Sequence, residues 1–174
     1  MMRIREECDI IIERHPHYKS LNKKLMEDVG KADYPEGLSY EDYFNFYAKH
    51  SSYDTLSKNI DIINSWVINV LGIQYPPPDT YKYSVVDNWF AVYNRGDWVD
   101  YHDHVPTTYS FVYFVNCPKG SAPLKFYDRG KTVKAEDGKL VIFPSLLRHS
   151  IPKNKCENRV SLIGNVLART SKRL

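Results

Sequence analysis

The chain has 174 residues, 43% of them hydrophobic, and its 24 basic and 21 acidic residues leave a formal net charge of +3. This composition suits one well-packed domain, residues 1–174, and the small net charge weighs against nucleic acid as a partner without excluding it. The three cysteines form no CxxC pair, and the longest apolar run near the N-terminus is three isoleucines. These features predict a cytoplasmic protein with no membrane segment.

Residues 1–72 are expected to provide helical support for the rest of the chain. Within them, residues 17–29 carry apolar side chains at helical spacing, and Gly30 follows as a stop signal. A second helix is predicted over residues 53–71, with Ser52 as its N-cap. Its apolar positions form one continuous stripe: Leu56, Ile60, Ile63, Trp66, Val67, Val70 and Leu71.

The sequence changes in character over residues 80–168, after the prolines of GIQYPPPD. Runs rich in β-branched and aromatic residues, such as TYSFVYFVN and KLVIFP, alternate with turn sequences such as NRGD and DRGK. Strands that recur without helices between them predict an antiparallel sandwich or barrel. We therefore expect a mainly β fold with N-terminal helices, in which the two helices brace one face of the strands.

The segment VDYHDHVP carries two histidines, His102 and His104, at the entrance to a predicted strand. Because side chains alternate along a strand, both histidines should point to one face and Asp103 to the other. His149 follows the run KLVIFP, where a neighbouring strand of a rolled sheet would bring it close to the first two. Three converging imidazoles suit Fe(II) or Zn and leave part of the coordination sphere open.

Two other metal-ligand sets remain open on the sequence alone. A local bulge would turn Asp103 toward the metal in place of His104, or Asp100 and His102 would form the first pair. Strand alternation favours the three histidines. The remaining histidines are assigned no metal role: His15, His17 and His50.

Arg159 and Ser161 follow His149 and lie two residues apart on the final predicted strand. They should therefore face the same side of the sheet. A guanidinium offers a fork of donors that matches a carboxylate, and the serine adds a hydroxyl. The pair predicts a carboxylate-binding site near the metal.

The pattern HxH…H…RxS formed by these residues resembles the HxD…H…RxS pattern of the iron(II)- and 2-oxoglutarate-dependent dioxygenases. The stretch from Trp89 to Asn165 carries the resemblance, and it is similar in order and spacing to the prolyl-hydroxylase-like branch and to small dioxygenases of bacteria and marine bacteriophages. That family commonly has Asp or Glu where this chain has His104. The resemblance implies a double-stranded β-helix (jelly roll) over residues 80–168, braced by the two helices.

Roles for individual residues also follow from the resemblance. It implies that Fe(II) is held by three ligands: His102, His104 and His149. It implies that 2-oxoglutarate is bound by Arg159 and Ser161, together with Tyr113 on the strand after the first two histidines. O2 would be the second co-substrate, and ascorbate is a candidate reductant. Four further residues are expected to contact the substrate or to support the ligands: Tyr93, Trp89, Asp103 and Asn165.

The reaction implied by the resemblance is hydroxylation of an unactivated C–H bond, with release of succinate and CO2, in the cytosol of a bacterium or of a phage-infected host. The substrate is unknown: a prolyl or other protein side chain, a small molecule and a nucleobase are all compatible with such a core. The oligomeric state is not predicted. Two alternatives remain open, a three-histidine metalloenzyme of cupin type that uses no 2-oxoglutarate and a non-catalytic jelly-roll module stabilised by its metal.

Overall fold

The computed structural model describes residues 10–35 and 47–170, and these form two antiparallel sheets and two α-helices. Within this part of the chain the larger sheet has six strands, in the order β1 (Ile11–Arg14), β8 (Lys139–Pro144), β5 (Tyr109–Asn116), β10 (Arg159–Thr170), β3 (Tyr81–Tyr93) and β2 (Lys49–His50). The smaller sheet has four, in the order β4 (Val99–His102), β9 (His149–Ile151), β6 (Leu124–Phe126) and β7 (Lys131–Val133). A short 3-10 helix, η2 (Tyr127–Arg129), joins β6 to β7. The prediction of a mainly β fold with N-terminal helices is confirmed.

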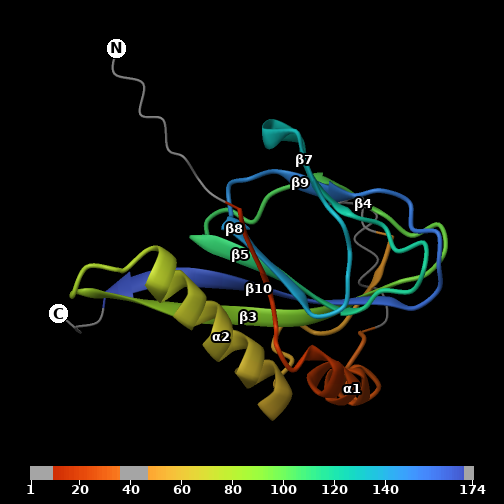
Figure 1. Cartoon of the computed structure of the whole chain (residues 1–174), viewed down its shortest axis with the longest axis horizontal. Coiled ribbons are helices and arrows are strands. Elements are labelled where there is room, and N and C mark those ends of the chain that lie inside the picture. The colour runs from red at the N-terminus through yellow and green to blue at the C-terminus, as the bar shows by residue number, and fades with distance from the viewer. Residues whose placement is uncertain (1–9, 36–46, 171–174) are drawn as a thin grey trace.

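The helices α1 (Tyr18–Val29) and α2 (Lys58–Gln74) lie on one side of the larger sheet, and β4, β7 and β9 lie on the other (Figure 1). The first helix begins one residue later than the predicted range of 17–29, because His17 is its N-cap, and it ends at Val29 as predicted. None of the described helices is both long and apolar enough to cross a lipid bilayer.

The second helix begins later than the sequence predicted. Its N-cap is Ser57, whose hydroxyl accepts the backbone N–H of Ile60 at 3.1 Å, so the assignment of Ser52 as the cap is wrong. Residues 53 and 54 instead lie against β3, because the Tyr53 carbonyl accepts the N–H of Asn88 at 2.9 Å. Leu56 therefore precedes the helix, and 80% of its surface is exposed.

Side-chain alternation divides the core into two layers. Phe111, Tyr113 and Val115 on β5 pack with the helices, whereas Val112 and Phe114 on the same strand pack between the two sheets. The central strand β10 alternates in the same way, with Val160, Leu162 and Val166 toward the helices and Ile163 toward the smaller sheet. The odd-numbered residues of β10 from 159 to 165 consequently face the layer between the sheets.

Candidate metal centre

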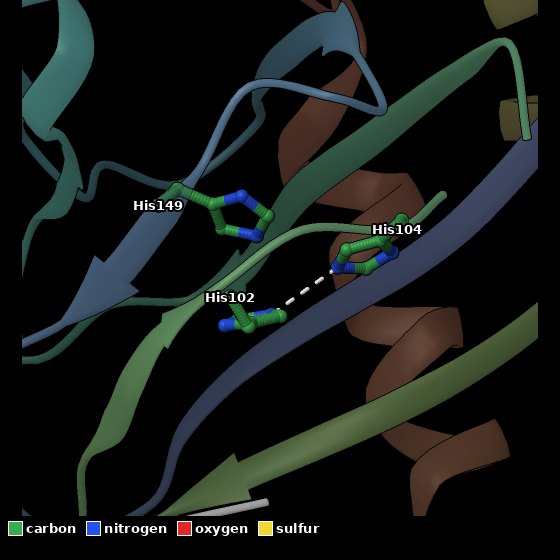
Figure 2. Close-up of side chains that lie close together, drawn as sticks. All are labelled: His102, His104 and His149. Carbon is green, nitrogen blue, oxygen red and sulfur yellow. Dashed lines mark hydrogen bonds between the residues drawn. The ribbon is translucent and has the colours of Figure 1, made fainter. Parts of the chain in front are cut away.

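The three histidines predicted as metal ligands lie together between the two sheets, as Figure 2 shows. His102 ends β4 and His149 begins β9, and the two are directly opposite each other in the antiparallel pairing of these strands. His104 lies two residues beyond the end of β4, and its backbone N–H donates to the carbonyl of Ser145, just after β8, at 2.9 Å. His104 therefore lies outside the strand, and a hydrogen bond to the chain after β8 holds it at the cluster. Strand alternation alone does not explain its position.

The ring nitrogens of the cluster are close enough to share one ion. One nitrogen from each ring lies within 4.8 Å of the other two, and Nε2 of His102 is 3.2 Å from Nε2 of His104 (Figure 2). The ring centroids are 4.3 Å apart for His102 and His149 and 5.1 Å apart for His104 and His149. Imidazole ligands on three sides leave positions open for small-molecule ligands.

Each of the three rings has its Nδ1 next to an oxygen. His102 Nδ1 is 2.8 Å from the Asp100 carbonyl, and His149 Nδ1 is 3.0 Å from the Leu147 carbonyl. His104 Nδ1 is 2.8 Å from the side-chain oxygen Oδ1 of Asn165. Since a carbonyl oxygen only accepts, these contacts place the ring proton on Nδ1 and leave the Nε2 lone pair for a metal. In these tautomers the 3.2 Å contact between Nε2 of His102 and Nε2 of His104 brings two lone pairs together and is not a hydrogen bond.

Burial keeps the three imidazoles neutral. It lowers the pKa of His102 to about 4, and it lowers the pKa of His104 below its ordinary value. The pKa of His149 lies well below the ordinary range because the ring is buried and because charge on His102 or His104 would repel its own. Neutral imidazole is the form that binds metals.

Neither nearby aspartate joins the cluster. Asp103 is exposed, and its Oδ1 accepts the backbone N–H of Val105 at 3.2 Å. Asp100 is also exposed, and its contact with His102 runs through the backbone carbonyl. Among the described residues, the group that could hold an ion consists of histidines alone.

Arg159 and Ser161 sit in the layer between the sheets. Arg159 is fully buried and donates from Nε to the carbonyl of Ala122 at 3.1 Å. Its Nη1 and Nη2 atoms and the Ser161 hydroxyl find no hydrogen-bond partner among the described residues. Burial lowers the pKa of Arg159. Because burying a cation without an anion is costly, this arrangement points to an anionic ligand.

Two aromatic rings hold the guanidinium in place. The central carbon of Arg159 lies 4.5 Å from the ring centroid of Tyr93 and 5.3 Å from that of Phe114. Burial raises the pKa of Tyr93 to about 12, against the opposing effect of the Arg159 charge. Tyr93 is therefore a neutral phenol beside the candidate anion site.

The structure does not bring Tyr113 to the histidines and Arg159. Tyr113 has the opposite parity to Phe114 on β5, so its ring packs with the helices. Its hydroxyl donates to Oδ1 of Asn22, on α1, at 2.6 Å. The side chain therefore ties helix α1 to the larger sheet and does not face the histidines.

A cleft of about 340 Å³ opens outward from the histidines. Trp89 lines it and stacks on His104, with ring centroids 5.9 Å apart and an angle of 19° between the rings. The other lining residues are Tyr53, Asp87, His102, Asp103, Val105, Pro106, Thr107 and Asn165. The structure thus brings Trp89, Asp103 and Asn165 to one cleft beside the histidines.

A second cavity lies inward, between the sheets, and has a volume of only about 30 Å³. All three histidines line it together with Tyr93 and hydrophobic side chains of both sheets. A cavity of this volume has room for about one water molecule. A five-carbon dicarboxylate would need these side chains to move apart before it could reach from the histidines toward Arg159.

The sequence assigned His50 no role, and the structure places it near the other histidines. This residue on the edge strand β2 pairs with Ala91 of β3 and lines the inner cavity. Burial lowers its pKa to about 4, and charge on His102 would lower it further. No motif surrounds His50 in the sequence, so only the pairing of a two-residue strand reveals its place near the other histidines.

No protein-family model matches the chain, and no curated protein matches it. Solved structures with a similar fold include 2-oxoglutarate- and iron(II)-dependent oxygenases, and several of these are prolyl hydroxylases.

Three of these structures are prolyl hydroxylases. A Pseudomonas putida prolyl-4-hydroxylase is 17% identical, with a TM-score of 0.68 over 94% of each chain. The viral collagen prolyl hydroxylase of Paramecium bursaria Chlorella virus-1, solved as a 2-oxoglutarate complex, is 14% identical, with a TM-score of 0.67 over 89% of this chain and 94% of that one. A Trichoplax adhaerens prolyl hydroxylase in complex with a fragment of hypoxia inducible factor is 12% identical, with a TM-score of 0.66 over 90% of this chain and 82% of that one.

Proposed function

We propose that the protein is an Fe(II)- and 2-oxoglutarate-dependent dioxygenase that hydroxylates an unactivated C–H bond, and that its two sheets form a double-stranded β-helix. The observation that carries the proposal is the combination of three histidines whose ring nitrogens converge and a buried arginine whose Nη1 and Nη2 have no hydrogen-bond partner among the described residues. The shared fold with 2-oxoglutarate-dependent oxygenases supports this reading. We also propose that the protein is cytoplasmic, because Cys117 and Cys156 are free thiols.

The donor set fits a divalent iron ion. His102, His104 and His149 are neutral, face one another and have their Nδ1 atoms held by oxygens, as metal-bound histidines require. When bound with 2-oxoglutarate and O2, iron supplies the oxidising power for hydroxylation, and succinate and CO2 are released. The protein's own part is to hold the three rings in one tautomer and to limit access of water to the site.

Arg159 and Ser161 would bind the distal carboxylate of 2-oxoglutarate. Nη1, Nη2 and the serine hydroxyl are buried polar atoms facing the layer between the sheets, and an anion would satisfy all three. Tyr93 packs under the guanidinium and lines the inner cavity, so it would touch the co-substrate along its length. Binding of 2-oxoglutarate would enlarge the inner cavity, and Tyr93 is one of the side chains that would move.

The substrate would enter through the outer cleft. Trp89 and Tyr53 supply aromatic surface there, and Asp103 stands at the rim. A prolyl or other protein side chain is the substrate class we favour, because a neighbour of the same fold was solved with a peptide fragment bound. A small molecule or a nucleobase is a further candidate for the same cleft.

Anaerobic titration of the Fe(II)-loaded protein with 2-oxoglutarate tests the proposal. Wild type should develop a charge-transfer absorption band and, after admission of O2 with ascorbate as reductant, release succinate. Arg159→Ala should keep its metal while losing the response to 2-oxoglutarate. If wild type binds iron yet shows no spectral change with 2-oxoglutarate, the proposal is wrong.

The absence of a carboxylate from the described histidine cluster favours one second candidate, a three-histidine metalloenzyme of cupin type that uses no 2-oxoglutarate. Arg159 would then anchor the substrate itself. The same titration separates the two functions, since only the dioxygenase responds to 2-oxoglutarate. A jelly-roll module that is merely stabilised by its metal would lose thermal stability on chelation and turn over no substrate.

A further inference from the structure

The three oxygens that face the imidazole Nδ1 atoms are not equivalent. Two of them, at Asp100 and Leu147, are backbone carbonyls, which can only accept a hydrogen bond and whose place is set by β4 and by the turn before β9. The third is Oδ1 of Asn165, on β10, which faces His104. A side-chain amide has an acceptor and a donor that can exchange places by rotation. The tautomer of His104 therefore depends on which way one amide points.

Only one orientation of the Asn165 amide suits a metal. With Oδ1 toward the ring, His104 carries its proton on Nδ1 and presents a lone pair on Nε2, 3.2 Å from Nε2 of His102. With the amide nitrogen toward the ring, Nδ1 would have to accept, and the proton would lie on Nε2. That proton would occupy the position where a metal must bind.

A chain of buried hydroxyls reaches Asn165 from the other side. The Ser110 hydroxyl donates to Asn165 Oδ1 at 2.7 Å, Ser110 Oγ is 2.8 Å from Ser145 Oγ, and Ser145 Oγ is 2.7 Å from Thr107 Oγ1. Thr107 Oγ1 donates to the carbonyl of His104 at 2.8 Å. Ser110 and Ser145 are completely buried, so bulk water does not compete at these two positions.

Counting protons gives this chain a direction. Each hydroxyl has one proton to donate. Thr107 donates its proton to the carbonyl of His104, and Ser110 donates its proton to Oδ1 of Asn165. Ser110 then has no proton left for Ser145, so Ser145 donates to Ser110. The Ser110 proton holds the oxygen of the Asn165 amide, not its nitrogen, between Ser110 and His104.

We propose that Asn165 is a positioning residue that makes His104 a metal ligand, and that Ser110 sets the orientation of the Asn165 amide. The inference rests on the proposed function only in taking the three histidines as metal ligands. A carboxylate at position 104 would bind metal without any choice of tautomer, whereas a third imidazole needs an oxygen acceptor behind it. In this protein the Asn165 amide, held in place by Ser110, supplies that oxygen acceptor to His104.

Three variants of the full chain test the proposal, with a fourth as control. Asn165→Leu removes the acceptor at similar volume, Asn165→Asp supplies an acceptor that cannot present a donor when ionised, and Ser110→Ala frees the amide to rotate. Ser57→Ala is the matched control, because it removes the N-cap of α2 and thereby lowers stability away from the histidines. Two readouts are needed: calorimetric affinity for Co(II), and the protonated ring nitrogen of His104 in the metal-free protein from long-range proton–nitrogen NMR spectra.

Wild type should show the proton of His104 on Nδ1. Asn165→Leu should weaken Co(II) binding by roughly 10- to 100-fold and shift the His104 proton population toward Nε2. Ser110→Ala should show a smaller change in the same direction, whereas Asn165→Asp should bind Co(II) at least as tightly as wild type. Ser57→Ala should lower the melting temperature and leave the Co(II) affinity unchanged.

The proposal is overturned if Asn165→Leu keeps wild-type Co(II) affinity and an Nδ1 proton on His104. If Asn165→Leu does not fold, the other two variants decide. Ser110→Ala with wild-type Co(II) affinity and an unchanged His104 tautomer overturns the role of Ser110. Asn165→Asp with weakened Co(II) affinity overturns the role of Asn165. Failure of the metal assignment itself would look different, because wild type would then bind no Co(II) while the NMR spectra still reported the tautomer.

Discussion

His102 and His149 lie directly opposite each other in the antiparallel pairing of β4 and β9, with ring centroids 4.3 Å apart. Directly opposed positions bring side chains of the same face into contact. Two neutral imidazoles in this arrangement, each with Nδ1 held by a backbone carbonyl, form a preorganised pair of candidate metal ligands. Binding should therefore require little rearrangement of either ring.

Metal binding should stabilise the folded protein. A divalent ion present at a hundred times its dissociation constant adds about 2.7 kcal/mol to the free energy of unfolding. For a chain of this length, that corresponds to a rise in melting temperature of roughly 5 to 10 °C. Differential scanning fluorimetry with Fe(II) under anaerobic conditions, or with Co(II), measures the shift. His149→Ala should abolish it, and His17→Ala, an exposed histidine of the N-terminal part, should retain it in full.

Arg159 should cost stability in the absence of a bound anion. Because burying a charge without a counter-ion is costly, replacing the Arg159 guanidinium by a hydrophobic side chain of similar length should remove that cost. Arg159→Met should therefore unfold at the same urea concentration as wild type or a higher one, while its affinity for 2-oxoglutarate falls by at least about tenfold. Equilibrium unfolding and anaerobic 2-oxoglutarate titration of the metal-loaded protein give the two values. Unchanged 2-oxoglutarate affinity would contradict the assignment of this residue.

For Tyr113 we expect the opposite result to that for Arg159: a loss of stability without a change in affinity for 2-oxoglutarate. Tyr113→Phe removes the hydrogen bond to Oδ1 of Asn22 and leaves that buried oxygen without its partner. The free energy of unfolding should fall by about 1 to 3 kcal/mol. The affinity for 2-oxoglutarate should not change, because the hydroxyl faces helix α1. A variant with normal stability and weakened 2-oxoglutarate binding would restore the role that the family resemblance implies for this tyrosine.

The metal-free protein should lose stability on mild acidification. His50 and His102 have pKa values of about 4 in the folded state, because both are buried, against an ordinary value of 6.5. Between pH 6.5 and pH 4 the unfolded chain binds more protons than the folded one, so the free energy of unfolding falls as the pH falls. We expect a loss of about 2 kcal/mol or more between pH 7 and pH 5.

Urea unfolding at the two pH values measures this loss. His50→Gln removes one of the titrating groups and should make the pH dependence shallower. Equal stability of the wild-type protein at pH 7 and pH 5 would show that these imidazoles are not held neutral by the fold.

Helical periodicity located both helices, and the spacing of polar residues in the strand-rich half singled out the histidines and Arg159. The errors have local physical causes. The start of α2 was misplaced because two serines compete as caps, and the contact of Tyr53 with Asn88 on β3 decides between them. The family resemblance implied a co-substrate role for Tyr113, and strand parity does not predict its layer, because parity tells which residues share a face but not which face meets the helices.

The sequence by itself determined which side chains are available for chemistry: three histidines, two nearby aspartates as alternative ligands, and an arginine and a serine at strand spacing. Periodicity is a local property, and it is readable wherever a few residues repeat in order. The tertiary structure alone decided that His102 meets His149 across two strands, that Asn165 stands behind His104, and that His50 lines the inner cavity. These relationships depend on the register between strands far apart in the chain, and many weak packing contacts distributed over both core layers set that register.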